Sequence, residues 1–137
     1  MATIHMDLVT PERRLISTEV DEVKARAAKG EFEVLPGHSN YITLLDIGEL
    51  SYRESGNTKH VAVTGGFAEV TLEEGIRIMA ECAECAEEID TERAEAAKER
   101  AEKRLQESDP SGQGIDLVRA QAALQRSMVR LGVARKG

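Results

Sequence analysis

The sequence predicts an α+β protein in which a β-sandwich comes first and two helices follow. Three observations carry this prediction: period-two alternation over residues 1–80, a run of helix-forming residues from Ala80 to Glu107, and a second amphipathic segment after a polar turn. With 137 residues, the chain has the length of one ordinary domain with a small appendage. We divide it into a sandwich domain, residues 1–86, and a helical hairpin, residues 87–137.

Short strands are expected before residue 80, because apolar side chains recur there at every second position. The pattern is clearest at Ile4/Met6/Leu8, Val61/Val63 and Ile76/Ile78/Ala80. Turn residues separate the strands at Thr10–Glu12, Pro36-Gly37 and Gly65-Gly66. Two glycines could also suggest a phosphate-binding loop, but neither a lysine nor a helical pattern follows them, so we expect a tight turn. Closely spaced short strands are typical of a β-sandwich or barrel.

Two helices are expected after the strands. The first runs from near Glu87 to Gln106, with acids in its first turns and bases later, as the helix dipole favours. The second runs from about Asp116 to Leu131, and the polar turn between them predicts an antiparallel hairpin. The stripes expected to face each other are Ala94, Ala97, Ala101 and Leu105 on the first helix and Leu117, Ala120, Leu124, Met128 and Leu131 on the second.

The two helices repeat one another at an offset of 26 residues: Ile-Asp-x-x-Arg-Ala occurs at 89–94 and again at 115–120. Three arginines recur at matching positions, Arg93, Arg100 and Arg104 against Arg119, Arg126 and Arg130. Each trio lies within about 40° around its helix, so each helix carries an arginine ridge. The second ridge has no acid after Asp116. A solvated ridge, a polyphosphate site and a dock for an acidic protein surface all remain open.

Several classes of function are excluded or disfavoured by composition. A net charge of −7 argues against non-specific nucleic-acid binding, and no stretch approaches the roughly 18 apolar residues of a membrane span. The N-terminus lacks a signal-peptide pattern. Cys82 and Cys85 form a C-x-x-C without the second pair that a zinc site needs, so we expect two inert residues and no metal. His5, His38 and His60 are scattered, and we find no catalytic constellation.

Two segments are specific enough to suggest a family: GEFEVLPGH at Gly30–His38 and TGGFAEV at Thr64–Val70, followed by the AEEID…AKERAEKRL helix. The chain resembles the epsilon subunit of the bacterial F-type ATP synthase, from Val9 to Ala134. The resemblance implies a flattened antiparallel β-sandwich of about ten strands and a two-helix hairpin, in a non-catalytic subunit of the central stalk. It implies that the sandwich binds the gamma subunit and the c-subunit ring, with Glu31 on a loop facing that ring. It also implies a peripheral location, through the complex, at the cytoplasmic face of the bacterial plasma membrane without direct membrane insertion.

The resemblance further implies a regulatory hairpin. In this family the hairpin folds on the sandwich or extends toward the alpha and beta subunits of the catalytic head, where it inhibits ATP hydrolysis. Arg126, Arg130 and Arg135 are the expected docking residues. Some members bind ATP, and the positions that match their motif are Glu84, Ile89, Asp90, Arg93, Ala94, Arg100, Arg126 and Arg130. ATP is therefore expected as a regulatory ligand, and no cofactor is required.

Two other functions are kept as alternatives. A stand-alone adaptor would have the same sandwich and hairpin without any link to ATP synthase. A small redox protein would use Cys82 and Cys85, although the strand-then-helix context typical of redox pairs is missing. These two cysteines are not part of the family pattern and carry no role implied by it.

Overall fold

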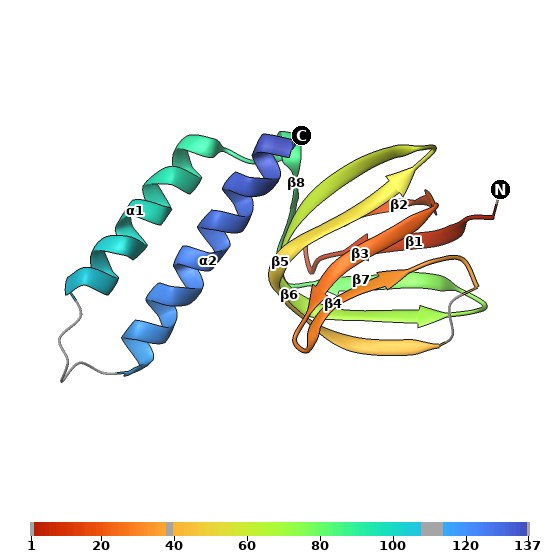
Figure 1. Cartoon of the computed structure of the whole chain (residues 1–137), viewed down its shortest axis with the longest axis horizontal. Coiled ribbons are helices and arrows are strands. Elements are labelled where there is room, and N and C mark those ends of the chain that lie inside the picture. The colour runs from red at the N-terminus through yellow and green to blue at the C-terminus, as the bar shows by residue number, and fades with distance from the viewer. Residues whose placement is uncertain (1, 38–39, 108–113, 137) are drawn as a thin grey trace.

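The computed structural model describes residues 2–37, 40–107 and 114–136, so His38 and residues 108–113, where the sequence predicts a turn, lie outside the described residues. Within this part of the chain, eight strands precede two helices, and the helices lie together at one end of the strand domain (Figure 1). The strands are β1 (Ile4–Val9), β2 (Arg14–Val20), β3 (Glu22–Ala27), β4 (Gly30–Val34), β5 (Tyr41–Glu54), β6 (Asn57–Thr71), β7 (Gly75–Ala80) and β8 (Ala83–Cys85).

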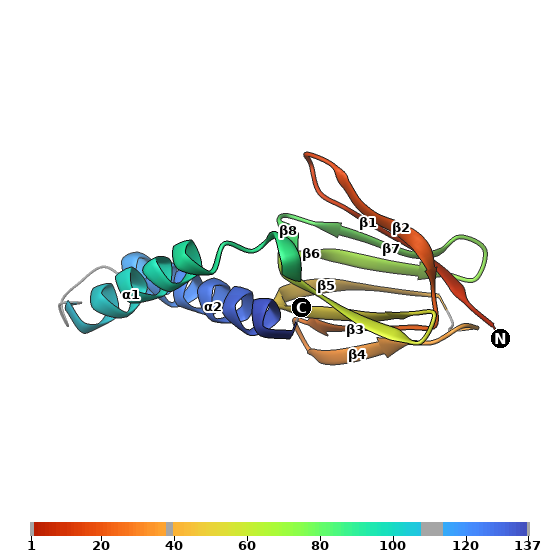
Figure 2. The ribbon, with the colours of Figure 1, turned by 90° about the horizontal axis from the view of Figure 1, so that it is seen from above.

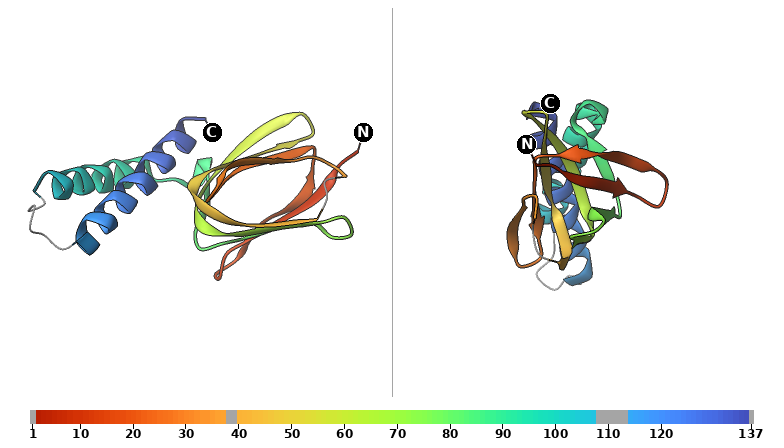
Figure 3. Two further views of the ribbon diagram at one scale, coloured as in Figure 1. Left: turned by 60° about the horizontal axis from the view of Figure 1, so that its bottom comes forward. Right: turned by 90° about the vertical axis from the view of Figure 1, so that its right-hand side faces the viewer.

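All eight strands belong to one hydrogen-bonded sheet that folds over into two layers (Figure 3). Neighbouring strands follow the order β2-β1-β7-β6-β5-β3-β4, and β8 pairs with β6. The described pairs are antiparallel except β1 with β7, where Met6 lies opposite Ile76 in a parallel register. The predicted β-sandwich is confirmed, with eight described strands where about ten were expected. The longest strands are β5 and β6, with 14 and 15 residues.

The sandwich has a hydrophobic core of its own. Met6 and Leu8 of β1 are fully buried, as the period-two pattern predicted, and the alternating residues of the other strands join them. The further fully buried aliphatic side chains of this core include Val20, Val23, Val34, Val61, Val70 and Ile78. Among the described residues, its buried members all lie between Met6 and Ala83, and none belongs to a helix.

Gly65 and Gly66 lie inside β6 and do not form the tight turn that the sequence suggested. Their φ angles of 107° and 122° fall in a region that favours glycine. A Cβ on Gly66 would lie 2.0 Å from the carbonyl oxygen of Met79 on the neighbouring strand. Glycine is therefore needed here for a close approach of two backbones, and the two residues hold neither a turn nor a phosphate loop.

The helices are α1 (Thr91–Glu107) and α2 (Gly114–Lys136), preceded by a short 3-10 helix, η1 (Ala86–Glu88). The first helix begins later than the expected Glu87, because Asp90 caps it: the Asp90 carboxylate accepts a hydrogen bond of 3.1 Å from the backbone N–H of Arg93. The two helices run antiparallel (Figure 1), as predicted. Ala94 and Ala101 of α1 and Ala120 of α2 are buried, which lets the two backbones approach closely.

Helix α2 lies between α1 and the sandwich (Figure 1), and the hairpin extends the long axis of the molecule beyond the strands (Figure 2). A second, smaller apolar cluster joins the C-terminal part of α2 to the sandwich. On α2 its central residue is Val133, which is 1% exposed. Val133 packs in one cluster with Ala62, Ala86 and Ile89. This contact explains why Ala62 is buried although its β6 neighbours Val61 and Val63 point into the main core.

Candidate functional site

Polar contacts surround the small apolar cluster between α2 and the sandwich. The guanidinium of Arg130 meets Glu84 of β8 side-on: Nε lies 2.8 Å from Oε1, and Nη2 donates to Oε2 over 3.2 Å. Near the end of α2, Lys136 Nζ lies 2.7 Å from Glu49 Oε2, and the other oxygen of Glu49 lies 2.8 Å from His60 Nδ1. We call these contacts, together with the bond from Gln125 Nε2 to the carbonyl oxygen of Ile47 (3.0 Å), the hairpin latch.

The latch combines a small apolar area with ion pairs that stay partly in water. The side chains of Arg130 and Glu84 are 23% and 34% exposed, and Lys136 is 50% exposed. Partly exposed ion pairs each contribute roughly 0–1 kcal/mol. The contact between hairpin and sandwich is therefore much weaker than the cohesion of the sandwich core.

The structure brings together only some of the residues expected to bind ATP. Glu84 and Arg130 contact each other directly. Ile89 is buried in the cluster beneath α2, and Ala94 is fully buried in the helix pair. Asp90 uses one carboxylate oxygen to cap α1. These roles are structural in the folded hairpin, whatever ligand it binds.

The other three expected ATP-binding residues, Arg93, Arg100 and Arg126, have exposed side chains. None of them forms an ion pair with another described residue. A groove of about 480 Å³ lies beside α2, but it is lined by Arg26, Ile47, Leu105, Gln121, Leu124, Gln125, Met128 and Val129. The groove is thus distinct from the predicted nucleotide site.

The expected docking and ring-facing residues lie on the surface. Arg135 is exposed at the end of α2, whereas Arg130 is held by Glu84 in this arrangement. Glu31 is exposed, but it belongs to strand β4, where it pairs with Arg26 of β3, and not to a loop. The ladder of β4 starts at Gly30, which has φ of 128°, directly after the short turn that follows β3.

Cys82 and Cys85 are free thiols; Cys82 directly precedes β8, and Cys85 is its last residue. Cys82 is exposed, and Cys85 packs partly against the sandwich core. Burial, aided by Glu88 and Glu87, raises the pKa of the Cys85 thiol to about 11. Glu88 also binds Arg13 of the β1–β2 turn through two contacts, of 2.9 and 3.1 Å, which hold η1 on the sandwich. Arg13, with the backbone N–H of Cys85, holds the pKa of the Glu88 carboxyl below its usual value.

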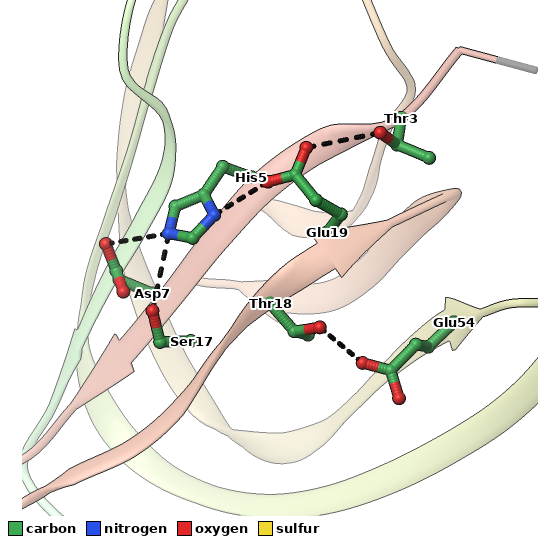
Figure 4. Close-up of polar contacts among 7 residues, drawn as sticks. All are labelled: Thr3, His5, Asp7, Ser17, Thr18, Glu19 and Glu54. Atoms are coloured by element: carbon green, nitrogen blue, oxygen red, sulfur yellow. Dashed lines mark hydrogen bonds and ion pairs between the residues drawn. The ribbon is translucent and has the colours of Figure 1, made fainter.

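Sequence reasoning missed a polar cluster around His5 (Figure 4). The two ring nitrogens meet different partners: Nδ1 lies 2.7 Å from Glu19 Oε2, and Nε2 lies 3.4 Å from both Asp7 Oδ2 and Ser17 Oγ. The hydrogen bond to Glu19 leads the causes that raise the pKa of His5. Two carboxylates beside the ring stabilise its protonated form. The cluster joins β1, which carries His5 and Asp7, to β2, which carries Ser17 and Glu19.

Large apolar side chains gather on the outer face of β5, β6 and β7. Leu44 lies opposite Phe67, and Phe67 lies opposite Met79, so the three share one face of the sheet. Ile42, two residues before Leu44, continues this face, and Ile42 and Leu44 are 65% and 67% exposed. A groove of about 350 Å³ extends from Phe67 and Met79 to the turn around Pro11. We call Ile42, Leu44, Phe67 and Met79 the apolar strip; exposed apolar surface of this kind is a candidate contact surface.

Two features are absent from the described part of the chain. No helix there is long and apolar enough to cross a membrane. The described residues also hold no group of three or more histidine, cysteine, aspartate or glutamate side chains placed to bind a metal ion.

Comparison with known proteins gives full-length matches. Residues 3–86 match the family model of the ATP synthase delta/epsilon chain β-sandwich domain, and residues 87–135 match that of the delta/epsilon chain long α-helix domain. The ATP synthase epsilon chain of Nitratidesulfovibrio vulgaris is 46% identical over 131 residues, covering 96% of this chain and 95% of that protein. The epsilon chain of Syntrophobacter fumaroxidans is 47% identical over 133 residues, covering 97% and 96% of the two chains.

Solved structures show the same fold. A chain in the Euglena gracilis mitochondrial ATP synthase structure (OSCP/F1/c-ring) superposes with a TM-score of 0.81 and 28% identity, covering 98% of this chain and 82% of that one. A chain in the central stalk and c-ring structure of the Tetrahymena thermophila mitochondrial ATP synthase has a TM-score of 0.62 at 12% identity, over 95% of each chain, and supports the fold alone. The sandwich, the helix pair and the full-length relatives agree, and this chain belongs to the family of ATP synthase epsilon chains, which are non-catalytic subunits of that enzyme.

Proposed function

We propose that this chain is a rotor and regulatory subunit of an F-type, proton-translocating ATP synthase. In this proposal the sandwich, residues 1–86, joins the gamma subunit and the c ring in the central stalk, and the hairpin, residues 87–137, inhibits ATP hydrolysis. The family supports the stalk role, since the similar chains are named as epsilon chains and one similar structure is described as a c-ring assembly. The complex would then sit at the cytoplasmic face of a bacterial plasma membrane. The adaptor and redox-protein alternatives gain no support from these comparisons.

The single observation that carries the regulatory part is the contrast between two interfaces. The sandwich core closes by itself, whereas the hairpin is held by a four-residue apolar centre and the partly exposed latch. A module attached this weakly can be released at a modest free energy while the rest of the molecule stays folded. That property suits a hairpin that leaves the sandwich to reach the alpha and beta subunits.

For the gamma subunit we propose the apolar strip as the contact surface. Ile42 and Leu44 expose about two-thirds of their surface, which is unusual for neighbouring large aliphatic side chains on one strand. Glu69 and Arg77 lie across from each other on the same face and would supply the polar rim of such an interface. Glu31, exposed beside the β3–β4 turn, is proposed to face the c ring.

For ATP, we propose that the folded hairpin binds the triphosphate through Arg93, Arg100 and Arg126, with Arg130 positioned by Glu84. Exposed guanidinium groups without an ion-pair partner among the described residues are suited to bind phosphate oxygens, because the ligand would relieve their mutual repulsion. ATP would then stabilise the latched hairpin by an amount limited to its differential affinity for the two states. High ATP would oppose inhibition, and low ATP would favour it.

The test is reconstitution of the enzyme with the full chain or with a chain truncated after Glu88. The truncated chain is expected to bind gamma and to support proton-coupled synthesis, because the sandwich core and the apolar strip remain, while ATP hydrolysis is no longer inhibited. A matched full-length control, Ile42→Asp, is expected to weaken gamma binding and leave the hairpin intact. If the folded, truncated chain fails to bind gamma, or still inhibits hydrolysis, this division of roles is wrong.

A further inference from the structure

The C-x-x-C pair brackets the strand that carries Glu84 of the latch: Cys85 is the last residue of β8 (Ala83–Cys85), and Cys82 lies at a bend directly before it. Backbone hydrogen bonds hold this segment against β6: Thr64 N–H donates to the carbonyl oxygen of Cys82 over 3.1 Å, and Cys85 pairs with Val61. The chain is therefore extended over Ala83–Cys85, directly after Cys82. Glu84, between the two cysteines, is the residue that holds Arg130 of α2.

An extended strand keeps these two thiols apart. Cys85 packs on the sandwich core on the same face of β8 as the buried Ala83, whereas Cys82, directly before the strand, is exposed. Three steps of a strand also separate the two Cα atoms by about 10 Å. A disulfide needs about 4.4–6.8 Å between Cα atoms. The bond is thus incompatible with the pairing of β8 on β6.

We propose that Cys82 and Cys85 form a redox switch for the hairpin, in which a disulfide between them traps β8 in an unpaired state and releases the latch. The paired strand β8 and the disulfide exclude each other. The free energy that stabilises the pairing of β8 on β6 therefore opposes disulfide formation, and the disulfide disfavours the pairing by the same factor. Oxidation would remove the strand position of Glu84, and with it the contact to Arg130. It would also displace the N–H of Cys85, which now donates to Glu88 over 3.0 Å.

The oxidant is a hydroperoxide, and the reaction has two steps. The exposed Cys82 thiolate attacks one oxygen of hydrogen peroxide; a sulfur–oxygen bond forms, the oxygen–oxygen bond breaks and hydroxide leaves, giving a sulfenic acid. The Cys85 thiolate then attacks the sulfur of that acid; the disulfide forms and a second hydroxide leaves. Two thiols lose two electrons, and one peroxide is reduced to two waters once the hydroxides take up the thiol protons.

The order of these steps follows from the environments of the two thiols. Cys82 is open to solvent, so peroxide can reach it while β8 is paired. Cys85 is half-buried beside two carboxylates, which keep its thiol protonated in the closed strand. It becomes a nucleophile only when β8 opens and the thiol is hydrated. Disulfide formation by Cys85 therefore requires the opening of β8.

The test uses the isolated full-length chain with hydrogen peroxide as the probe. Intact mass should show loss of two hydrogens, and amide exchange at residues 61–64, 83–85 and 125–134 should become at least about tenfold faster, because these residues lose their pairing and packing. Dithiothreitol should restore the original exchange, which excludes irreversible unfolding. Cys82→Ser and Cys85→Ser, treated in the same way, should keep the exchange of the reduced chain.

Three outcomes would overturn the proposal: no disulfide forms, it forms with exchange unchanged, or Cys82→Ser shows the same acceleration. The last would assign the effect to methionine oxidation. The consequence in the assembled enzyme rests on the proposed inhibitory role of the hairpin, whereas this experiment does not. Peroxide-dependent release without any change in ATP hydrolysis would leave the switch intact and count against the proposed function.

Discussion

Arg130 of α2 and Glu84 of β8 form a side-on ion pair across 46 positions of sequence, with 2.8 Å between Nε and Oε1. The pair links the last described strand of the sandwich to the helix that packs on it. Both residues also belong to the positions expected to bind ATP. Because the arginine already has a partner, the folded hairpin is stabilised by this contact before any ligand binds.

Breaking this pair should shift the hairpin toward release. We expect Arg130→Gln and Glu84→Gln to show a coupling free energy of about 1 kcal/mol in a double-mutant cycle, equivalent to about a fivefold change in docking. The NMR shift of the Ala62 methyl group measures docking, since this methyl packs against α2. Arg135→Gln is the matched control, because Arg135 is exposed and forms no ion pair with a described residue. Equal effects of all three variants, with no coupling, would show that the pair does not hold the hairpin.

Gly66 should be intolerant of a side chain, although the sequence suggested an ordinary turn glycine. A Cβ there would lie 2.0 Å from Met79 O, and φ is 122°, so we expect Gly66→Ala to lower the free energy of unfolding by more than about 3 kcal/mol. Gly132→Ala on α2 is the contrasting variant. Apart from the adjacent residues and the backbone of its own helix, no atom lies within 4 Å of the new Cβ, and removal of a helix glycine should stabilise the chain by about 0.5–1 kcal/mol. Urea unfolding measures the change in the free energy of unfolding for both variants. A mild effect of Gly66→Ala would contradict the close approach of the Gly66 and Met79 backbones.

The His5 cluster should make the β1–β2 pair more stable at acidic than at alkaline pH. Glu19 and Asp7 raise the pKa of His5 above 6.5, so the contribution is fully present below 6.5 and is lost as pH rises through the folded-state pKa. The pKa of Asp7 is lowered in the folded chain, so its contribution to stability is lost at much lower pH, as the Asp7 carboxylate becomes protonated. NMR titration of the imidazole measures the pKa directly. Glu19→Gln should move the pKa of His5 back toward 6.5, and Ser17→Ala should leave this pKa above 6.5. An unchanged pKa in Glu19→Gln would show that the hydrogen bond to Glu19 is not its cause.

The sequence predicted the strands and helices well where one face of an element is buried. Met6 and Leu8 followed the alternation, and Ala94 and Ala101 followed the helical stripe. Prediction failed where an element has neighbours on two sides. Helix α2 contacts both α1 and the sandwich, so Met128 of the expected stripe is 54% exposed while Ser127 is 3% exposed. A single stripe cannot describe a helix that is packed from two directions.

Side-chain contacts between residues far apart in the sequence were harder to predict than the buried faces of strands and helices. A regular hairpin centred on Pro11 and Glu12 would place His5 opposite Thr18, but an irregularity between Leu8 and Val9 shifts the register by one, which brings Glu19 to His5. The sequence contains no signal for that shift. Glu84 and Arg130 were grouped only by resemblance to the family, because periodicity does not reach across 46 residues.

The arginines of α2 should carry inhibition in the assembled enzyme. Residues 117–137 contain five bases and no acid, and in the folded hairpin Arg126 and Arg135 are exposed, while release frees Arg130. We expect the triple change Arg126→Ala, Arg130→Ala and Arg135→Ala to raise ATP hydrolysis by the reconstituted enzyme, and wild-type inhibition to weaken as salt increases. Lysine at the same three positions is the matched control and should retain most of the inhibition. Inhibition that is insensitive both to the alanine changes and to salt would rule out an electrostatic dock.

Binding of ATP to the isolated chain should depend on arginines that have no structural task in the folded hairpin. Arg93 and Arg126 are exposed, one on each helix, so their replacement removes phosphate contacts without disturbing the apolar cluster. We expect saturable binding at millimolar ATP by calorimetry, weakened about tenfold in Arg93→Ala and in Arg126→Ala, since a hydrogen bond to a charged group contributes roughly 1.5–3 kcal/mol.

Arg104→Ala is the matched control for these two variants, because Arg104 is an exposed arginine of α1 outside the motif. Its affinity for ATP should stay within about twofold of the wild type, since surface charges beyond direct contact are screened by salt. Equal weakening in all three variants would show general attraction of a polyanion to basic helices. Binding undiminished in Arg93→Ala and Arg126→Ala, or no saturation at millimolar ATP, would remove the sensing role. The arginine ridges would then serve only as docking charges for the acidic surface of a partner subunit.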